Sequence, residues 1–449
     1  MSTGSFRLSI GCLVAGVMFM GCGPARTASD DRQEVLFWHF WGGEDRQVVE
    51  KIVEQFNASQ TKHVVRAIAM PGNNLDLKLF LAIAGKDPPD LVNQDDPVIG
   101  DWARRDTLMA IDDIIDQDEL DDLHSWLLPA ARDLGSYDGR LFGVANGLDV
   151  RAMYYNQTLL EEHGFQPPRT IDELDDIAKA LGPQDSSTRA DRFGFLPNPK
   201  LLWSWGIVFG GSFFDEKSKT VTVADKGIVA ALRWMAGYGR RYGQAAVSFR
   251  AANQSLPGKV FPLTAGRYAM IVGGQWRIRD IRDSQQAQAE RGQPVTAYGV
   301  TALPSLPGGR ANAGWINGNL FLVPNNSSNP AGAWEFMKFW IGFGQHEDRA
   351  AQTCIAGGWI PVSQHVVETR IFQDFLNEEP LMRTFVELAA SPNQRPRPNV
   401  PGAPLIDREL KTAAGIAMYH RGNREVKEVL EEAERRIRQF VDAESGRKP

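Results

Sequence analysis

Apolar residues along the chain change repeatedly from strand-like runs to helical spacing. Residues 34–38, 64–69 and 90–92 have the composition of short strands. Between them, residues 44–57 and 75–84 have the spacing of amphipathic helices, with apolar side chains returning to one face every three or four positions. Strands that alternate with helices in this way predict an α/β sheet that carries helices on its faces.

Helix signals continue through the middle and the end of the chain. Thr170 and Glu173 have the spacing of a capping box, which predicts a helix that ends near Gly182. Residues 228–238 and 426–440 again place apolar side chains on one helical face. The proline-rich residues 391–404 predict a loop, and their composition suits an extended surface segment.

Residues 298–340 combine both kinds of pattern. A strand-like run at 298–303 and a second extended run at 320–323 are followed by a helix, which Asn329 can cap and Pro330 can open. An apolar run between glycines, lying between two long helical regions, predicts a strand that passes from one lobe of the protein to another.

Length and charge limit the possible classes of protein. At 449 residues, the chain exceeds what one hydrophobic core usually organises, so we expect two domains. The 43% of apolar residues and 23% of charged residues describe a globular protein. The formal net charge of −6 argues against a nucleic-acid partner, because there is no basic stripe to neutralise phosphates.

The first residues predict export. Residues 1–21 contain no acidic residue and an apolar stretch too short to span a bilayer, as in a signal peptide. The stretch ends in FMGC, which resembles a bacterial lipobox and predicts lipid modification of Cys22, although Phe19 stands where leucine is usual. The alternative is an ordinary signal peptide with an incidental cysteine. Residues 22–33 read as a tether. Cleavage would leave only Cys22 and Cys354, so no disulfide within the domain is expected once Cys22 is acylated.

Five stretches, in their order and spacing, resemble the carbohydrate-binding solute-binding proteins of bacterial ABC importers, the maltose-binding-protein-like group. They are VLFWHFWGG, PPDLVNQDD, GRLFGVANGLDVRAMYYNQTLLEEHGFQPPRTIDEL, GRYAMIVGGQW and YGVTALPSLPGG…GNLFLVP…NPAGAWEFMKFW. The resemblance implies two α/β lobes, each made of non-contiguous segments, with the ligand held between them. It places crossing segments near residues 146–150, 315–320 and 357–361.

The same resemblance implies the domain boundaries and the role. Lobe 1 would comprise residues 34–146 and 320–358, and lobe 2 residues 147–319 and 359–449. The protein would be a lipid-anchored, monomeric and non-catalytic component that captures an oligosaccharide and delivers it to the permease subunits of the importer. No cofactor and no metal is expected; His39, for example, has no second histidine or cysteine at metal-ligand spacing.

Sugar recognition needs flat aromatic rings and side chains that accept hydrogen bonds from hydroxyls. Trp41 follows the first strand at its carboxyl end, where an α/β fold opens its crevice, or alternatively fills the lobe interior. The other candidates rest on the resemblance or on the predicted crossings. They are Asp95, Asp96, Asn146, Asp149, Trp203, Trp205, Trp276, Trp315, Asn317 and Trp359.

Alternatives remain open for several of these candidates. Asp96 precedes a proline and suits a turn equally well, and Trp315 and Trp359 suit hinge packing. If their segment is extended, Trp203 and Trp205 lie on one side of it, and one of them is expected to stack on ligand. Trp276, in GGQW, matches the most recognisable aromatic platform of the family, with core packing as its alternative.

Enzymatic readings have less support. The chain lacks the G-x-S-x-G, H-E-x-x-H and G-x-x-x-x-G-K-[ST] motifs. An exported glycoside hydrolase that uses Asp96 and Asp149 as its carboxylate pair is the main alternative, because such a pair has no fixed motif. An assembly or adhesion lipoprotein is a third. Lys200, Arg277 and Arg279 leave room for an anionic or phosphorylated ligand.

Overall fold

A computed structural model describes residues 31–70, 75–183, 190–215, 217–254, 260–419 and 424–444. Residues 1–30, which include the predicted signal peptide, Cys22 and most of the tether, lie outside the described residues. One compact unit begins at Gln33 and runs to the end of the chain.

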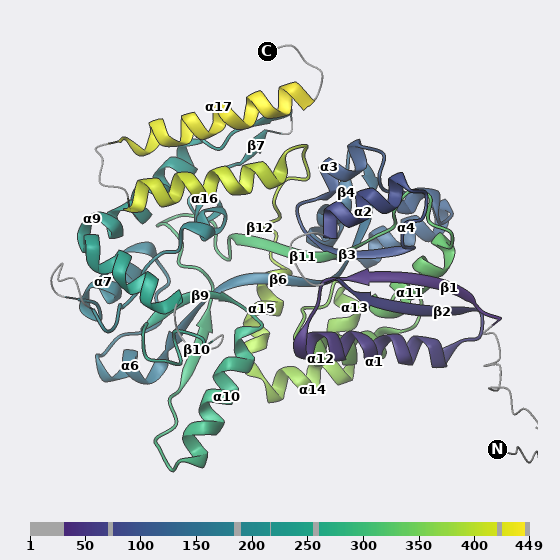
Figure 1. Cartoon of the computed structure of the whole chain (residues 1–449). Coiled ribbons are helices and arrows are strands. Elements are labelled where there is room, and N and C mark those ends of the chain that lie inside the picture. The colour runs from purple at the N-terminus through teal and green to yellow at the C-terminus, as the bar shows by residue number, and fades with distance from the viewer. Residues whose placement is uncertain are drawn as a thin grey trace, which may run out of the picture. The chain divides into compact units, whose positions relative to one another are not determined.

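An eight-stranded sheet organises this unit (Figure 1). Its strands are β1 (Gln33–His39), β2 (His63–Ala69), β3 (Leu91–Asp95), β6 (Gly143–Asn156), β9 (Met270–Gly274), β10 (Tyr298–Thr301), β11 (Gly314–Leu322) and β12 (Gln394–Arg395). The strand order is β10-β6-β11-β3-β1-β2, with β9 paired to β6 and β12 to β11. Strands β2, β1 and β3 are parallel, as the alternation of strands and helices predicts, whereas β11 runs antiparallel to both β3 and β6.

Strand β6 belongs to both halves of the sheet. Its first half pairs with β11, and its second half pairs with β9 and β10. We call β1, β2 and β3 with the helices packed on them the first lobe, and β9 and β10 with their helices the second lobe. The predicted first and second crossings therefore lie side by side, with Asp149 opposite Asn317. The third also lies here, because Ile360 exchanges backbone hydrogen bonds with Leu148.

Helices cover the sheet as the apolar spacing predicts. In the first half of the chain they are α1 (Gly43–Ser59), α2 (Leu75–Ala84), α3 (Ile99–Arg104), α4 (Gln117–Trp126), α5 (Pro129–Gly135), α6 (Gln157–Glu162), α7 (Ile171–Ala180) and α8 (Leu202–Val208). The remaining ones are α9 (Lys226–Gln254), α10 (Arg277–Glu290), α11 (Pro330–Ile341), α12 (Glu347–Gly357), α13 (Gln364–Val367), α14 (Arg370–Glu378), α15 (Pro380–Ala389), α16 (Ala403–Tyr419) and α17 (Val426–Glu444). The described residues also form two 3₁₀ turns, η1 (Ile111–Asp113) and η2 (Pro199–Leu201), and two small hairpins. The hairpins are β4 (Ser136–Tyr137) with β5 (Arg140–Leu141) and β7 (Phe214–Asp215) with β8 (Thr220–Val221).

Local sequence signals set the helix ends. Thr170 accepts a hydrogen bond from the amide of Glu173, whose own side chain bonds back to the Thr170 amide, so the predicted capping box is confirmed. Helix α7 ends at Ala180, two residues before Gly182. The Asn329 side chain caps α11 and Pro330 opens it, also as predicted.

The proline-rich residues 391–404 are not the surface segment that their composition suggests. Gln394, Arg397 and Val400 are buried, and β12 adds a short strand beside β11. Beyond it, the Asn399 side chain donates to carbonyls of α5 and β4, and the Gly402 amide donates to the carboxylate on α3. The segment is held because its polar groups find partners on the first lobe.

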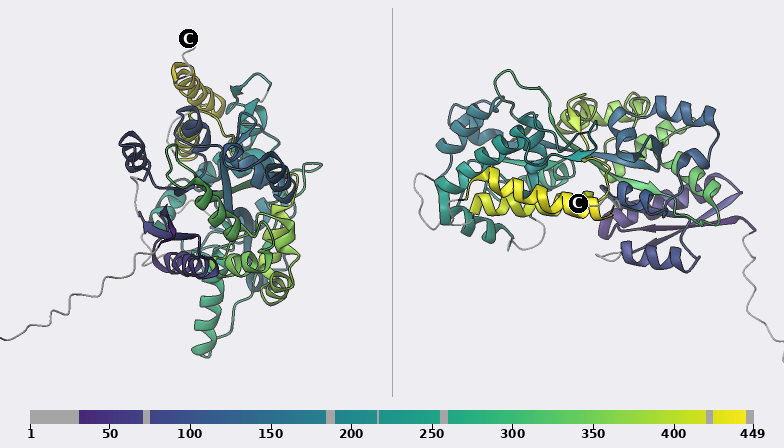
Figure 2. Two further views of the ribbon diagram at one scale, coloured as in Figure 1. Left: turned by 90° about the vertical axis from the view of Figure 1, so that its right-hand side faces the viewer. Right: turned by 90° about the horizontal axis from the view of Figure 1, so that it is seen from above.

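Helices α16 and α17 follow this segment and lie side by side (Figure 2). Helix α16 packs on α9 in the second lobe, and α9 is kinked at Gly243, which has a positive φ of 48°. The face of α17 that was predicted from its spacing is buried at Val426, Leu430 and Ile437. The chain thus touches the first lobe at residues 394–402 and returns to the second.

Candidate functional site

A pocket of about 450 Å³ lies where β6 and β11 meet the second lobe. The first lobe contributes Asp95 at the end of β3, and the crossing strands contribute Arg151 and Trp315. The second lobe supplies side chains from η2, α8, β9, the start of α10, and α16. The members used below are Asp95, Arg151, Lys200, Trp203, Gly274, Trp276, Arg277, Trp315, Arg397, Asp407 and Lys411.

Aromatic and guanidinium groups stack along one side of the pocket. The guanidinium carbon of Arg151 lies 4.6 Å from the ring centre of Trp276 and 4.6 Å from that of Trp315. Arg397 lies against Trp315 as well, at 4.7 Å. A cation over an indole face contributes about 0.5–2 kcal/mol, so these contacts fix the rings in place. Trp315 is nearly covered, whereas Trp276 remains 42% exposed and offers ring surface to a ligand.

The position of Trp276 depends on a glycine. A Cβ built on Gly274 would lie 2.1 Å from the Trp276 ring, so no larger residue fits beneath it. The Gly274 carbonyl also accepts a hydrogen bond of 2.9 Å from the Tyr154 hydroxyl, which anchors the end of β9. The second glycine of the GGQW motif therefore allows the indole to lie directly on the strand backbone.

Arg397 is the centre of a buried ionic network. Its Nε and Nη2 atoms donate to the two carboxylate oxygens of Asp96, each at 3.1 Å, and Nη2 also donates to the Asp96 carbonyl at 2.9 Å. Nη1 donates at 3.1 Å to Asp407, which also accepts a 2.9 Å hydrogen bond from the Trp203 indole. Burial by itself lowers the pKa of Arg397, but Asp96 and Asp407 outweigh it and raise that pKa above its usual value. The carboxylate of Asp96 is therefore fully engaged by protein.

Asp149 is held by a glutamine. Gln275 donates to Asp149 Oδ1 at 2.6 Å and to the Leu148 carbonyl at 3.1 Å, and it accepts from the Val150 amide at 3.3 Å. Burial raises the pKa of Asp149 above its usual value, against the opposing influence of nearby Arg151 and the Gln275 hydrogen bond. A carboxylate on an apolar crossing strand needs a polar partner, and Gln275 provides it.

Asp95 differs from its neighbour because its carboxylate is open to the pocket. The surrounding protein walls and then the nearby Asp96 raise the pKa of Asp95 to about 7, while Arg397 acts in the opposite direction. Asp149 raises it further and Arg151 lowers it, so four charged side chains face this carboxylate. The raised pKa favours the protonated form of Asp95 more than in an ordinary aspartate, and the protonated form can both donate and accept hydrogen bonds.

The structure brings together some of the predicted site residues. Asp95, Trp203, Trp276 and Trp315 line the pocket, and Asp96 joins it through Arg397. Asn146 and Asn317 are buried in the paired crossing strands. Trp41 and Trp359 lie outside the pocket lining, in an aromatic cluster with Trp340, where ring centres are 5.5–5.8 Å apart.

Trp203 and Trp205 do not lie on one side of an extended segment, because residues 202–208 form helix α8. Two residues apart on a helix, the side chains point in nearly opposite directions. Trp203 faces the pocket and Asp407, whereas Trp205 is 0% exposed and packs in the second lobe against Phe195 and Trp234.

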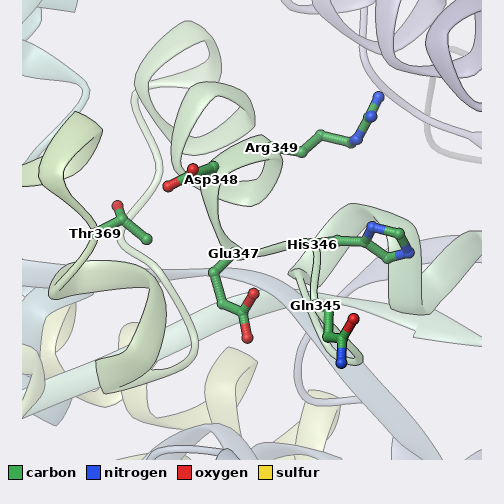
Figure 3. Close-up of a pocket in the computed structure, with 6 residues that line it drawn as sticks. All are labelled: Gln345, His346, Glu347, Asp348, Arg349 and Thr369. Carbon is green, nitrogen blue, oxygen red and sulfur yellow. The ribbon is translucent and has the colours of Figure 1, made fainter.

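A second hollow, of about 420 Å³, lies at the start of α12 and contains none of the predicted residues. Figure 3 shows that the Arg349 side chain points away from Glu347 and Asp348. Arg349 lies instead against the Phe339 ring at 4.4 Å. Asp348 extends toward Thr369, whereas Glu347 points elsewhere, so the two carboxylates of this hollow do not converge on one point (Figure 3).

A sequence profile of bacterial extracellular solute-binding proteins matches residues 51–384, which is more than half of the chain. The chain belongs to this family. Among its relatives, the maltooligosaccharide ABC transporter solute-binding lipoprotein of Streptococcus pneumoniae (strain ATCC BAA-255 / R6) is 20% identical over 403 residues, or 86% of each chain.

Solved structures show the same fold. CpMnBP1 with mannotriose bound has a TM-score of 0.73 and 21% identity, covering 90% of this chain and 100% of that one. The sugar-binding protein MalE of Xanthomonas citri has a TM-score of 0.73 and 19% identity, covering 92% and 98%. The predicted two-lobed fold and the predicted family are therefore confirmed.

Several residues in or beside the pocket of this solute-binding protein were not singled out from the sequence. Arg151 follows Asp149 by two positions on a strand, so strand alternation was a usable signal for it. Gln275 stands beside Trp276 in the GGQW motif and was overlooked because only the aromatic residue was considered. Arg397, Asp407 and Lys411 gave no local signal, because they reach the pocket only through the path of the C-terminal segment.

Within the described parts of the chain, no group of three or more histidine, cysteine, aspartate or glutamate side chains is arranged to hold a metal ion. None of the helices in those parts has the length and apolar character needed to cross a membrane. Cys354 is buried as a free thiol, and burial raises its pKa to about 12.

Proposed function

We propose that this protein captures a carbohydrate between its two lobes and passes it to the permease of an ABC importer. The main support is the exposed Trp276 ring in a pocket that also holds Asp95 and several hydrogen-bond donors. Such a ring suits the C–H face of a sugar, and polar groups around it suit the hydroxyls. Family membership adds support, as do relatives whose names refer to oligosaccharides.

The lobes in this proposal keep the expected boundaries. Lobe 1 comprises residues 34–146 and 320–358, and lobe 2 comprises 147–319 and 359–449, with part of the last segment reaching back to lobe 1. A ligand that contacts both lobes favours the state in which they are close, and it shifts the population toward that state. Contact between the lobes away from the crossing strands is already present at one rim, where Arg279 on α10 lies 3.0 Å from Glu44 on α1.

The proposed role is binding without turnover. Of the two carboxylates considered for a glycoside hydrolase, Asp96 is occupied by Arg397 and Asp149 by Gln275. These hydrogen bonds favour a binding role for the two carboxylates over the roles of general acid and nucleophile. We further propose that the protein acts as a monomer, is exported, and is anchored through lipid at Cys22, as the sequence predicts.

Calorimetric titration with neutral oligosaccharides such as maltotriose and mannobiose tests capture, and chromatography of the same samples tests turnover. We expect binding without released monosaccharide and a smaller radius of gyration in solution scattering when ligand is present. Trp276→Ala should weaken binding, whereas Trp126→Ala, a half-buried tryptophan that does not line the pocket, should not. Released product, or equal affinity in the Trp276 variant and the parent, would contradict the proposal.

A further inference from the structure

Positive side chains outnumber carboxylates on the pocket wall. Five cations line it, namely Arg151, Lys200, Arg277, Arg397 and Lys411, against the two carboxylates Asp95 and Asp407. Two of the cations are already neutralised. Arg397 is paired with Asp96 and Asp407, and Arg277 with Asp280 at 2.9 Å.

The other three cations form no ion pair within the described residues, although Asp149 and Asp95 lie near Arg151 and act on it electrostatically. Lys200, on η2, and Lys411, on α16, are exposed to the pocket, and neither forms an ion pair within the described parts of the chain. Arg151 forms none there either, and its Nη1 atom is buried without a hydrogen-bond partner. Like charges that line one pocket repel, and an anion bound among them offsets that repulsion.

Few carboxylates in the pocket remain available to accept hydrogen bonds from a ligand. Asp96 and Asp407 are bonded to Arg397, and Asp149 to Gln275. Among the described residues near the pocket, only the carboxylate of Asp95 has no hydrogen bond to its side chain, and its raised pKa leaves it partly uncharged near neutrality. Lysine and arginine side chains donate hydrogen bonds and accept none. The unpaired side chains of this pocket therefore suit a ligand that carries acceptor atoms.

We propose, building on the proposed function, that the captured carbohydrate is acidic, with a negatively charged group held by Lys200, Lys411 and Arg151 while a sugar ring lies on Trp276. A uronate carboxylate and a phosphate ester share this chemistry. Both provide anionic oxygens for charge-assisted hydrogen bonds beside a pyranose ring.

Calorimetry with matched ligands tests the inference on the purified protein. The panel is trigalacturonate with neutral galactotriose, and 6-phosphomannobiose with neutral mannobiose. We expect at least one acidic ligand to bind about tenfold or more tightly than its neutral counterpart, since one charge-assisted hydrogen bond is worth about that factor. The preference should weaken at high salt, and the tighter acidic ligand identifies carboxylate or phosphate as the charged group.

Charge-neutralising variants locate the effect. Lys200→Met and Lys411→Met should each weaken the acidic ligand about tenfold and weaken its neutral counterpart by a clearly smaller factor. Lys51→Met, on the exposed face of α1, removes the same charge outside the pocket and should leave both affinities unchanged. Neutral ligands that bind as tightly as the acidic ones would overturn this inference while sugar capture stands. Failure of every sugar in the panel to bind would overturn both.

Discussion

Replacing Arg397 by methionine should strongly destabilise the protein. The side chains of Arg397 and Asp96 are 8% and 1% exposed, so the variant would leave the Asp96 carboxylate buried without its partner. Removing one member of a buried ion pair costs about 3–5 kcal/mol, because the remaining charge keeps its desolvation penalty. Loss of the stacking on Trp315 adds about 0.5–1 kcal/mol. We therefore expect the free energy of unfolding to fall by about 3 kcal/mol or more.

Two further variants separate charge burial from packing. In the double variant Arg397→Met with Asp96→Asn, residue 96 no longer carries a buried, unpaired charge, so part of the lost stability should return. Arg66→Met is the matched surface control. Its partner is Glu34, the two side chains are 56% and 52% exposed, and such a pair contributes about 0–1 kcal/mol.

Urea unfolding, followed by both tryptophan fluorescence and circular dichroism, measures these free energies, provided that the two transitions coincide. The reasoning is refuted if Arg397→Met costs no more than Arg66→Met. It is equally refuted if the double variant is less stable than Arg397→Met alone, because the penalty would then not come from an unpaired Asp96.

Three other predictions follow from single contacts. The folded-state pKa of Asp95, about 7, lies above the ordinary 3.8, so the folded protein holds this proton more tightly and stability falls as pH rises between these values. Asp95→Asn should remove that loss. The free energy of unfolding, measured from about pH 4 to about pH 8, should then be higher in the variant than in the parent only in the upper part of this range. Gly274→Ala should displace the Trp276 ring, 2.1 Å from the new Cβ, and lower sugar affinity together with a change in tryptophan emission. Thr170→Ala should cost about 1 kcal/mol in urea unfolding through loss of the helix cap.

Each of these three predictions has an outcome that would contradict it. An unchanged pH profile in Asp95→Asn would mean that this carboxylate does not titrate near neutrality in the folded protein. For Gly274→Ala, the control is Gly237→Ala on α9, where the nearest atom to a new Cβ is 3.9 Å away and no loss of binding is expected. Equal effects of the two glycine variants would argue against a specific clash, and an unaffected Thr170→Ala would show that the cap contributes little.

Local sequence determined most of the elements of this protein. The spacing in β1, α1 and α2 predicted the strands and helices of the first lobe, and the capping box predicted the start of α7. These signals are local because periodicity and capping depend on residues a few positions apart. The helix at residues 202–208 was missed because its apolar and aromatic run lacks helical periodicity, and burial on all sides replaces the amphipathic pattern.

The local sequence predicted the pocket only in part. Trp276 and Asp95 were expected from motifs and from the end of a strand, but Arg397, Asp407 and Lys411 were not. Arg397 and Asp407 reach Asp96 and Trp203 from roughly 200 to 300 positions away in the chain, after β12 and the buried proline-rich segment. Local sequence patterns cannot predict such contacts. The position of the C-terminal segment depends on which polar groups of the folded lobe it can hydrogen-bond. The sequence by itself therefore determined the units and the aromatic ring, and tertiary packing decided which charges surround that ring and which of them remain free.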